Sequence, residues 1–188
     1  EVNRTDSGNG GVGLYVNYGK INNNSTGIVN VETTNNNANA VGIYGTNSTP
    51  IVNDGTVTVG GNNSFGILGL SYRLNSSGAM VDPSTEAYYN TAHSGTGTYG
   101  KVDVTNNNSI TMSGDSALGI YVHNNSTSAT NYNDHRGSAD ITATNTSTGI
   151  ITMNGGNNSI GMGANNGSLI NAGTINVNGT VSAGMYGT

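Results

Sequence analysis

One recurring stretch decides the fold, and it is clearest at residues 53–67, which read NDGTVTVGGNNSFGI. This stretch holds an apolar–polar–apolar triplet, a turn rich in Gly and Asn, and a glycine between two apolar residues. The triplets are Val29-Asn30-Val31, Val57-Thr58-Val59, Ile110-Thr111-Met112, Ile151-Thr152-Met153 and Ile175-Asn176-Val177, and the glycines are Gly13, Gly42, Gly66, Gly119, Gly161 and Gly184. A repeating unit of about 23 residues predicts a solenoid, in which each unit buries its apolar face by stacking on its neighbours.

The composition of the chain also favours a solenoid built from strands. Charged residues make up 8% of the sequence, whereas ordinary domains have about 25%. Gly accounts for 30 positions and Asn for 33, and the apolar residues between them alternate with polar ones. Such alternation is typical of half-buried strands. We therefore expect an all-β fold, a parallel β-helix (β-solenoid) of about six rungs that forms a single domain over residues 1–188.

Alternation also predicts which side chains point outward. If the two apolar residues beside each glycine fill the interior, the glycine and the residue two positions later should face solvent. This places Tyr15, Tyr44, Tyr121 and Tyr186 on one outer stripe, which is interrupted by Leu68 and Gly163. Two interpretations of the stripe remain open. The rings either stack on sugars through their apolar faces or shield the backbone between rungs.

A polar column is expected just before the triplets. Counting back from the corner glycines aligns Ser25, Asn53, Asn106, Ser147 and Asn171. Stacked Asn or Ser side chains can donate hydrogen bonds from one rung to the next. We expect these residues to form a ladder along the rod.

Two large insertions interrupt the repeats, at residues 70–100 and 123–139. They belong to consecutive rungs at the same corner, so we expect their roots to lie close together. Tyr, Arg and His side chains on loops of a rigid scaffold are typical of a recognition surface. The alternative is that the loops only pack on the rod. The candidate ligand-binding residues are Tyr72, Arg73, Tyr88, Tyr89, His93, Tyr99, His123, Tyr132, Asp134, His135 and Arg136.

Other functional classes find little support. The net charge of −5 disfavours nucleic-acid binding, which needs a basic face. No apolar run is long enough to span a membrane, and the absence of Cys excludes thiolate metal sites. The acidic residues expected on the coil fall in different columns and do not form a catalytic pair. We expect no enzyme activity, catalytic residue, metal or cofactor.

With its units aligned, the chain resembles the passenger regions of large type V autotransporter adhesins, in particular those of fusobacteria. The resemblance rests on Asn53–Val59 followed by Gly61–Ile67, and on Asn171–Val177 followed by Ser182–Tyr186. It implies a right-handed parallel β-helix, displayed outside the cell by an outer-membrane barrel that this segment does not contain. It also implies adhesion to host-cell proteins, host glycans or the surfaces of other bacteria.

The expected function is therefore that of a bacterial cell-surface adhesin segment, extracellular in location, that mediates attachment through the loops on its rod. A purely structural stalk or surface-fibre segment is the alternative, and a polysaccharide-degrading β-helix enzyme is a third. Because the repeat pattern is cut at Glu1 and at Thr188, we expect the chain to be a section of a longer rod.

Overall fold

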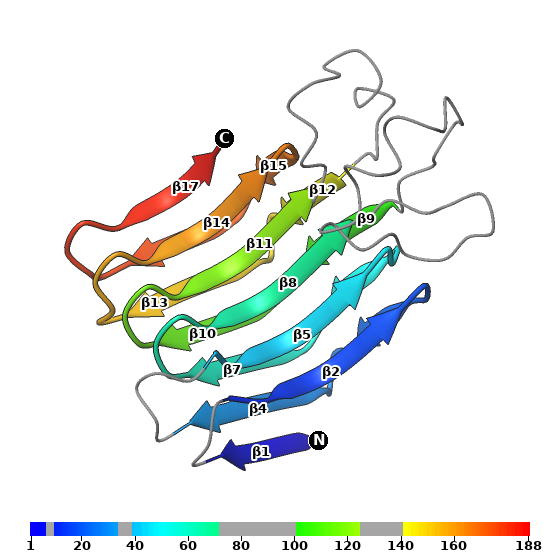
Figure 1. Cartoon of the computed structure of the whole chain (residues 1–188), viewed down its shortest axis with the longest axis horizontal. Coiled ribbons are helices and arrows are strands. Elements are labelled where there is room, and N and C mark those ends of the chain that lie inside the picture. Colours follow the sequence, from blue (N-terminus) through cyan, green and yellow to red (C-terminus); the bar gives the residue numbers. More distant parts are fainter. Residues whose placement is uncertain (7–9, 34–38, 72–100, 125–140) are drawn as a thin grey trace, which may run out of the picture.

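A computed structural model describes residues 1–6, 10–33, 39–71, 101–124 and 141–188 (Figure 1). In these ranges every regular element is a β-strand. The strands form three parallel sheets, and each coil of the chain passes through all three before it joins the next coil. The coil is a right-handed parallel β-helix, as Figure 1 shows, so the fold class expected from the sequence is confirmed.

We name the three sheets by their most regular residues. The triplet sheet holds β1 (Val2–Asp6), β4 (Ile28–Thr33), β7 (Thr56–Gly60), β10 (Ser109–Ser113), β13 (Ile150–Asn154) and β16 (Thr174–Val177). The glycine sheet holds β2 (Val12–Asn17), β5 (Val41–Thr46), β8 (Phe65–Ser71), β11 (Leu118–Asn124), β14 (Ile160–Asn165) and β17 (Ala183–Gly187). The asparagine sheet holds β3 (Ile21–Asn23), β6 (Ile51–Asn53), β9 (Val102–Asn106), β12 (Ile141–Asn145) and β15 (Ser168–Asn171).

The repeats stack in the register that the sequence predicts. In the triplet sheet, Val57 pairs with Ile110, and Ile110 pairs with Ile151. The middle residues pair in the same way, which places Thr58, Thr111 and Thr152 in one outward column. Each triplet therefore occupies the same place on its rung.

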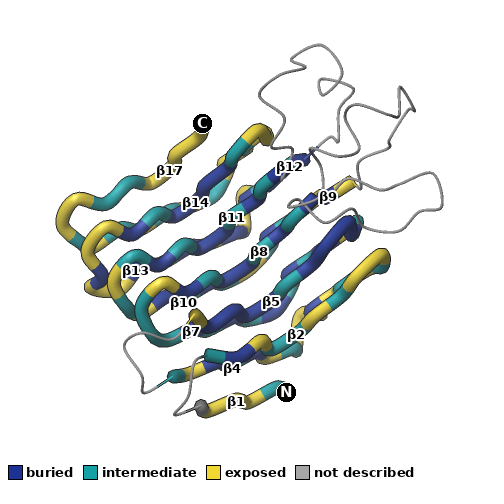
Figure 2. The backbone as a smooth tube through the Cα atoms, viewed as in Figure 1, coloured by how far each residue is buried: buried dark blue, intermediate teal, exposed yellow. Residues whose placement is uncertain are grey.

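The core fills the space between the sheets. The triplet sheet contributes Val29, Val31, Val57, Val59, Ile110, Met112, Ile151 and Met153, the glycine sheet Ile43, Ile67, Ile120 and Met162, and the asparagine sheet Ile51, Val102, Val104, Ile141 and Ala143. All of these side chains are buried, and they belong to one continuous cluster. Figure 2 shows that burial is greatest in the middle rungs, along β5, β8, β11 and β14. Each rung is thus stabilised by the rungs on either side of it.

The expected orientation of the glycine column is wrong. A Cβ atom on Gly119 would lie 2.5 Å from the Ile151 side chain and 2.5 Å from the Gly161 carbonyl oxygen. Gly66 meets Ile110 and the carbonyl oxygen of Gly119 in the same way. From Gly13 to Gly161 the glycines therefore face the interior, at a point where the triplet sheet leaves no room for a side chain, whereas a Cβ atom on Gly184 in the last rung would meet nothing within 4 Å.

Strict alternation fails at these glycines because two consecutive residues point inward. Gly66 and Ile67 are both buried, whereas Phe65 is only half-buried. The ring of Phe65 lies 6.0 Å from that of Tyr121, which is on the outer face. The residue after the glycine packs in the core as expected in every rung but the last, where Met185 is exposed. The residue before it was expected inside, but in most rungs it lies on the outer face.

The polar ladder exists, but two of its members differ from the expected ones. Asn23 and Asn145 occupy the column in place of Ser25 and Ser147, because both rungs have turns with two extra residues before the corner glycine. The amide Nδ2 of each Asn donates to Oδ1 of the next, at 2.8 Å in every step. The ladder runs through Asn23, Asn53, Asn106, Asn145 and Asn171.

The turns between the triplet and glycine sheets repeat as well. A left-handed backbone recurs there at Asn63, Ser116, Asn158 and Val181, with φ between 53° and 56°. The side chains of these turns form another chain of contacts. Asp115 accepts a hydrogen bond from the backbone N–H of Asn157 at 2.7 Å, and its own N–H donates to Asn62 at 2.8 Å. Asn and Gly tolerate this backbone at little cost, which explains the composition of the turns.

Candidate functional site

The two insertions begin at directly paired positions. Ser71 ends β8 and Asn124 ends β11, and these two residues are partners across neighbouring strands. The chain returns to the coil at Val102 in β9 and at Ile141 in β12, which are also partners. The expectation that the roots of the insertions lie side by side is confirmed.

The coil extends two residues further into each insertion than the repeat pattern predicts. Leu70 and Ser71 belong to β8, and His123 and Asn124 belong to β11. From here on, the insertions are residues 72–100 and 125–140, which lie outside the described residues. Of the candidate ligand-binding residues, only His123 is described. The others lie in the two insertions: Tyr72, Arg73, Tyr88, Tyr89, His93, Tyr99, Tyr132, Asp134, His135 and Arg136.

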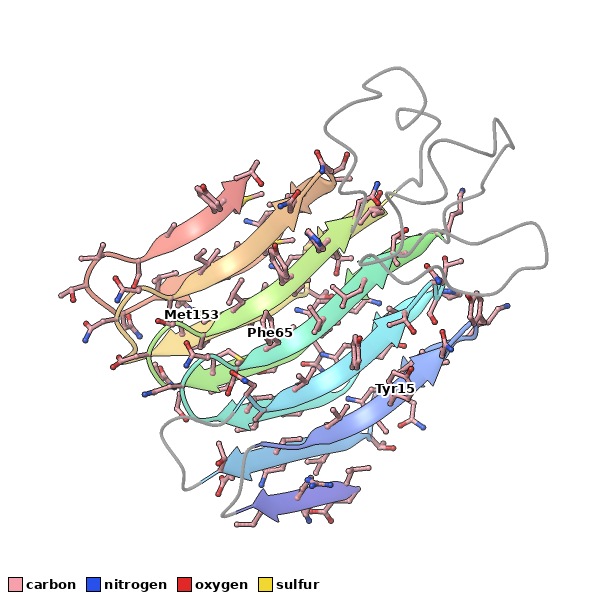
Figure 3. All side chains as sticks on the ribbon, viewed as in Figure 1. Tyr15, Phe65 and Met153 are labelled. Carbon is pink, nitrogen blue, oxygen red and sulfur yellow. The ribbon has the colours of Figure 1, made fainter. Side chains whose placement is uncertain are left out.

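The predicted tyrosine stripe is confirmed as an outward column of the glycine sheet. Pairing aligns Tyr15, Tyr44, Leu68, Tyr121, Gly163 and Tyr186. We call this set the tyrosine column. Tyr15 and Tyr186 are 58% and 54% exposed, and the rings of Tyr15 and Tyr44 lie 5.2 Å apart at an angle of 44°. Figure 3 labels Tyr15 on the face turned toward the viewer.

An aromatic cluster lies across the middle of this face, between the start of β8 and the end of β11. It consists of Phe65, Tyr121 and His123. The ring of Tyr121 is 6.0 Å from that of Phe65 and 6.1 Å from that of His123, and the latter pair is nearly parallel at 13°. The sequence interpretation missed Phe65, because it placed this residue in the core. Its signal is the glycine that follows, since an inward glycine turns the preceding side chain outward.

The glycine sheet has no carboxylate, ammonium or guanidinium group on its strands. Its six strands contain no Asp, Glu, Lys or Arg. Burial raises the pKa of the Tyr121 hydroxyl above its usual value, because the surrounding side chains exclude water from the ionised form. This face therefore presents aromatic rings and aliphatic groups to solvent.

Metal binding finds no support in the described part of the chain. No three His, Asp or Glu side chains come together there in a way that could hold an ion. His93 and His135 lie in the insertions, outside the described residues. The surface feature that the described residues do supply is the outer face of the glycine sheet.

Within the described ranges, no helix has the length and apolar character needed to cross a membrane. Comparison with known proteins gives no match to any protein-family model, to any curated protein or to any solved structure.

Proposed function

We propose that this chain is a segment of a bacterial cell-surface adhesin, whose β-helical rod mediates attachment to host cells or to other bacteria through its two large insertions. The observation that carries the proposal is the pairing of the insertion roots, Ser71 with Asn124 and Val102 with Ile141. A recognition surface formed by two segments needs both to start from fixed, neighbouring points.

The rod supplies that fixed support. Successive rungs are joined by parallel backbone pairing in three sheets and by the asparagine ladder. The insertions contain Tyr, Arg and His, which are favoured at binding sites, whereas the coil strands are mostly Val, Ile, Thr and Asn. Loops that carry recognition on a rigid scaffold fit this division of the sequence.

The test replaces the insertions with turns that the chain already uses. The link between β2 and β3 is residues 18–20, and the link between β14 and β15 is residues 166–167. One variant carries such a short turn in place of residues 72–100, a second in place of residues 125–140, and a third in place of both. A fourth keeps the length and composition of both insertions but scrambles their order, so it serves as the matched control for bulk and charge.

Binding to host cells and to bacterial cells is measured by flow cytometry with the labelled protein. Circular dichroism confirms in each variant that the strands are retained. We expect the doubly shortened and the scrambled variants to lose cell binding while keeping the β-sheet signal. Unchanged binding by the doubly shortened variant would refute attachment through the insertions. That result would favour the alternative, a structural stalk or fibre segment without a ligand in these loops.

A further inference from the structure

We propose that the outer face of the glycine sheet binds an uncharged, linear glycan that lies along the rod axis and stacks on the tyrosine column. This surface is made of coil residues and does not include the insertions. It is therefore a second binding site, and its existence does not depend on what the insertions bind.

The first argument is the spacing of the rings. Tyr44, Tyr121 and Tyr186 lie on β5, β11 and β17, which are every second strand of the glycine sheet. Parallel strands lie about 4.8 Å apart, so these rings recur about every 9.6 Å along the rod. This interval is comparable with one disaccharide of an extended β-linked glycan. Because alternate sugars of such a glycan are turned over, each ring would meet the same sugar face.

The second argument is the position of the Tyr121 ring. A Cβ atom on Gly163 would lie 2.9 Å from Cδ2 and 3.4 Å from Cε2 of Tyr121, so the ring leans over the bare backbone of Gly163. Phe65 and His123 flank the Tyr121 ring on the outer face of the glycine sheet. The glycine that interrupts the column therefore allows Tyr121 to tilt toward the sheet. A ring inclined in this way offers its apolar face to the C–H groups of a sugar.

The third argument is charge. None of the six strands carries Asp, Glu, Lys or Arg, whereas the other two sheets bear Glu32 and Asp103 on exposed positions. An acidic polysaccharide would find no Lys or Arg on this face. Asn17 and Asn165, at the ends of β2 and β14, provide amide groups that can bond to sugar hydroxyls. The combination of aromatic rings and a few amides matches a neutral glycan.

The test measures oligosaccharide binding by the full chain. The probes are chitohexaose and cellohexaose as neutral β-linked glycans, and oligogalacturonate as an acidic one. The chain has no Trp, so its intrinsic fluorescence comes from its ten tyrosines, four of which lie on the tyrosine column. Calorimetry provides an independent affinity. We expect at least one neutral probe to bind and the acidic probe to bind at least tenfold more weakly.

Three substitutions locate the site. Tyr121→Ala should weaken binding about three- to tenfold, because one aromatic contact is removed. Tyr121→Phe keeps the ring and should bind within about twofold of the parent. Tyr18→Ala is the matched control, since Tyr18 is 45% exposed but lies in the turn after β2 and not on the column. It should leave the affinity unchanged.

Gly163→Ala tests the geometry without removing a ring. The new methyl group must displace the Tyr121 ring, and we expect weaker glycan binding with little change in thermal stability. The scrambled-insertion variant should keep full glycan affinity even where cell attachment is lost, which separates this proposal from the preceding one. Failure of both neutral probes to bind would overturn the proposal, as would parental affinity in Tyr121→Ala. The glycan proposal would also be overturned if the parent protein formed a dimer and Tyr121→Ala were monomeric, because this face would then bind a second copy of the chain.

Discussion

Asn106→Ala removes the central member of the asparagine ladder. The Asn106 side chain is fully buried and takes part in three hydrogen bonds of 2.8 Å. It accepts one from Asn53 and donates one each to the side chain of Asn145 and to the carbonyl oxygen of Asn108. The substitution therefore cuts the ladder in its middle and leaves the backbone sheets in place.

The expected cost follows from these contacts. Three hydrogen bonds contribute about 1 kcal/mol each after exchange with water. Oδ1 of Asn145 then remains buried without its donor, which costs about 1–3 kcal/mol more, although some relaxation recovers part of this. Asn53 keeps a second bond, to the carbonyl oxygen of Ser109 at 3.4 Å. We expect a loss of about 3–5 kcal/mol in the free energy of unfolding, a large part of the 5–15 kcal/mol typical of domains.

Urea denaturation followed by circular dichroism gives the difference. Asn22→Ala is the matched control, because Asn22 is exposed on the outer face of β3, next to the ladder, and should cost less than about 0.5 kcal/mol. Asn171→Ala removes the exposed end of the ladder, which accepts one bond from Asn145, and should cost about 1 kcal/mol. The reasoning is refuted if Asn106→Ala costs no more than Asn22→Ala.

Three further predictions concern the coil. Gly119→Ala should lower the free energy of unfolding by about 1–3 kcal/mol or more in urea denaturation, because the new Cβ atom lies 2.5 Å from the Ile151 side chain. Gly184→Ala is the control. Its Cβ atom meets nothing within 4 Å, so the same assay should show almost no change. Val181→Asn should stabilise the fold by about 1 kcal/mol, because Val181 is 86% exposed and has a φ of 53° that a β-branched residue rarely adopts. A thermal melt measures the change, and a lower melting temperature in the variant would contradict this prediction. Burial raises the pKa of Tyr121 in the folded state, so the unfolded chain loses this proton at a lower pH than the folded chain does. The free energy of unfolding should therefore fall as the pH rises beyond about 10, and it should fall less in Tyr121→Phe. Equal falls in the two proteins would contradict the assignment.

The repeating residues of the coil could be predicted from the sequence with good accuracy. The triplets alternate regularly, so the register of Val57 with Ile110 followed directly from aligning the repeats. The tyrosine column was predicted for the same reason, since Tyr121 stands at a fixed distance from its glycine. These features depend on local periodicity, which a single sequence contains.

The ladder and the glycines show where periodicity is insufficient. Asn23 and Asn145 join the ladder because their turns are longer by two residues, and a fixed count back from the corner glycine cannot detect a change in turn length. The inward orientation of Gly119 depends on its distance from Ile151 in a different strand. Packing between sheets decides that orientation, and alternation along one strand does not.

The candidate site is predicted only in part. Its location follows from the repeats, because the two insertions interrupt consecutive rungs at the same corner. Phe65 was placed in the core and lies instead beside Tyr121, so the aromatic cluster was not anticipated. The candidate residues inside the insertions remain predictions, since repeats carry no information about segments that do not repeat.

The central claim is that neighbouring rungs stack in register, so that the insertions start side by side. The chain has no Cys, which allows spin labels to be attached at Leu70→Cys and His123→Cys, two positions that pair across β8 and β11. Strands about 4.8 Å apart should produce strong dipolar broadening in the electron paramagnetic resonance spectrum. Labels at Asn17→Cys and Leu70→Cys, two rungs apart, should give weaker broadening. A spectrum of the first pair equal to the sum of the singly labelled spectra would contradict the account.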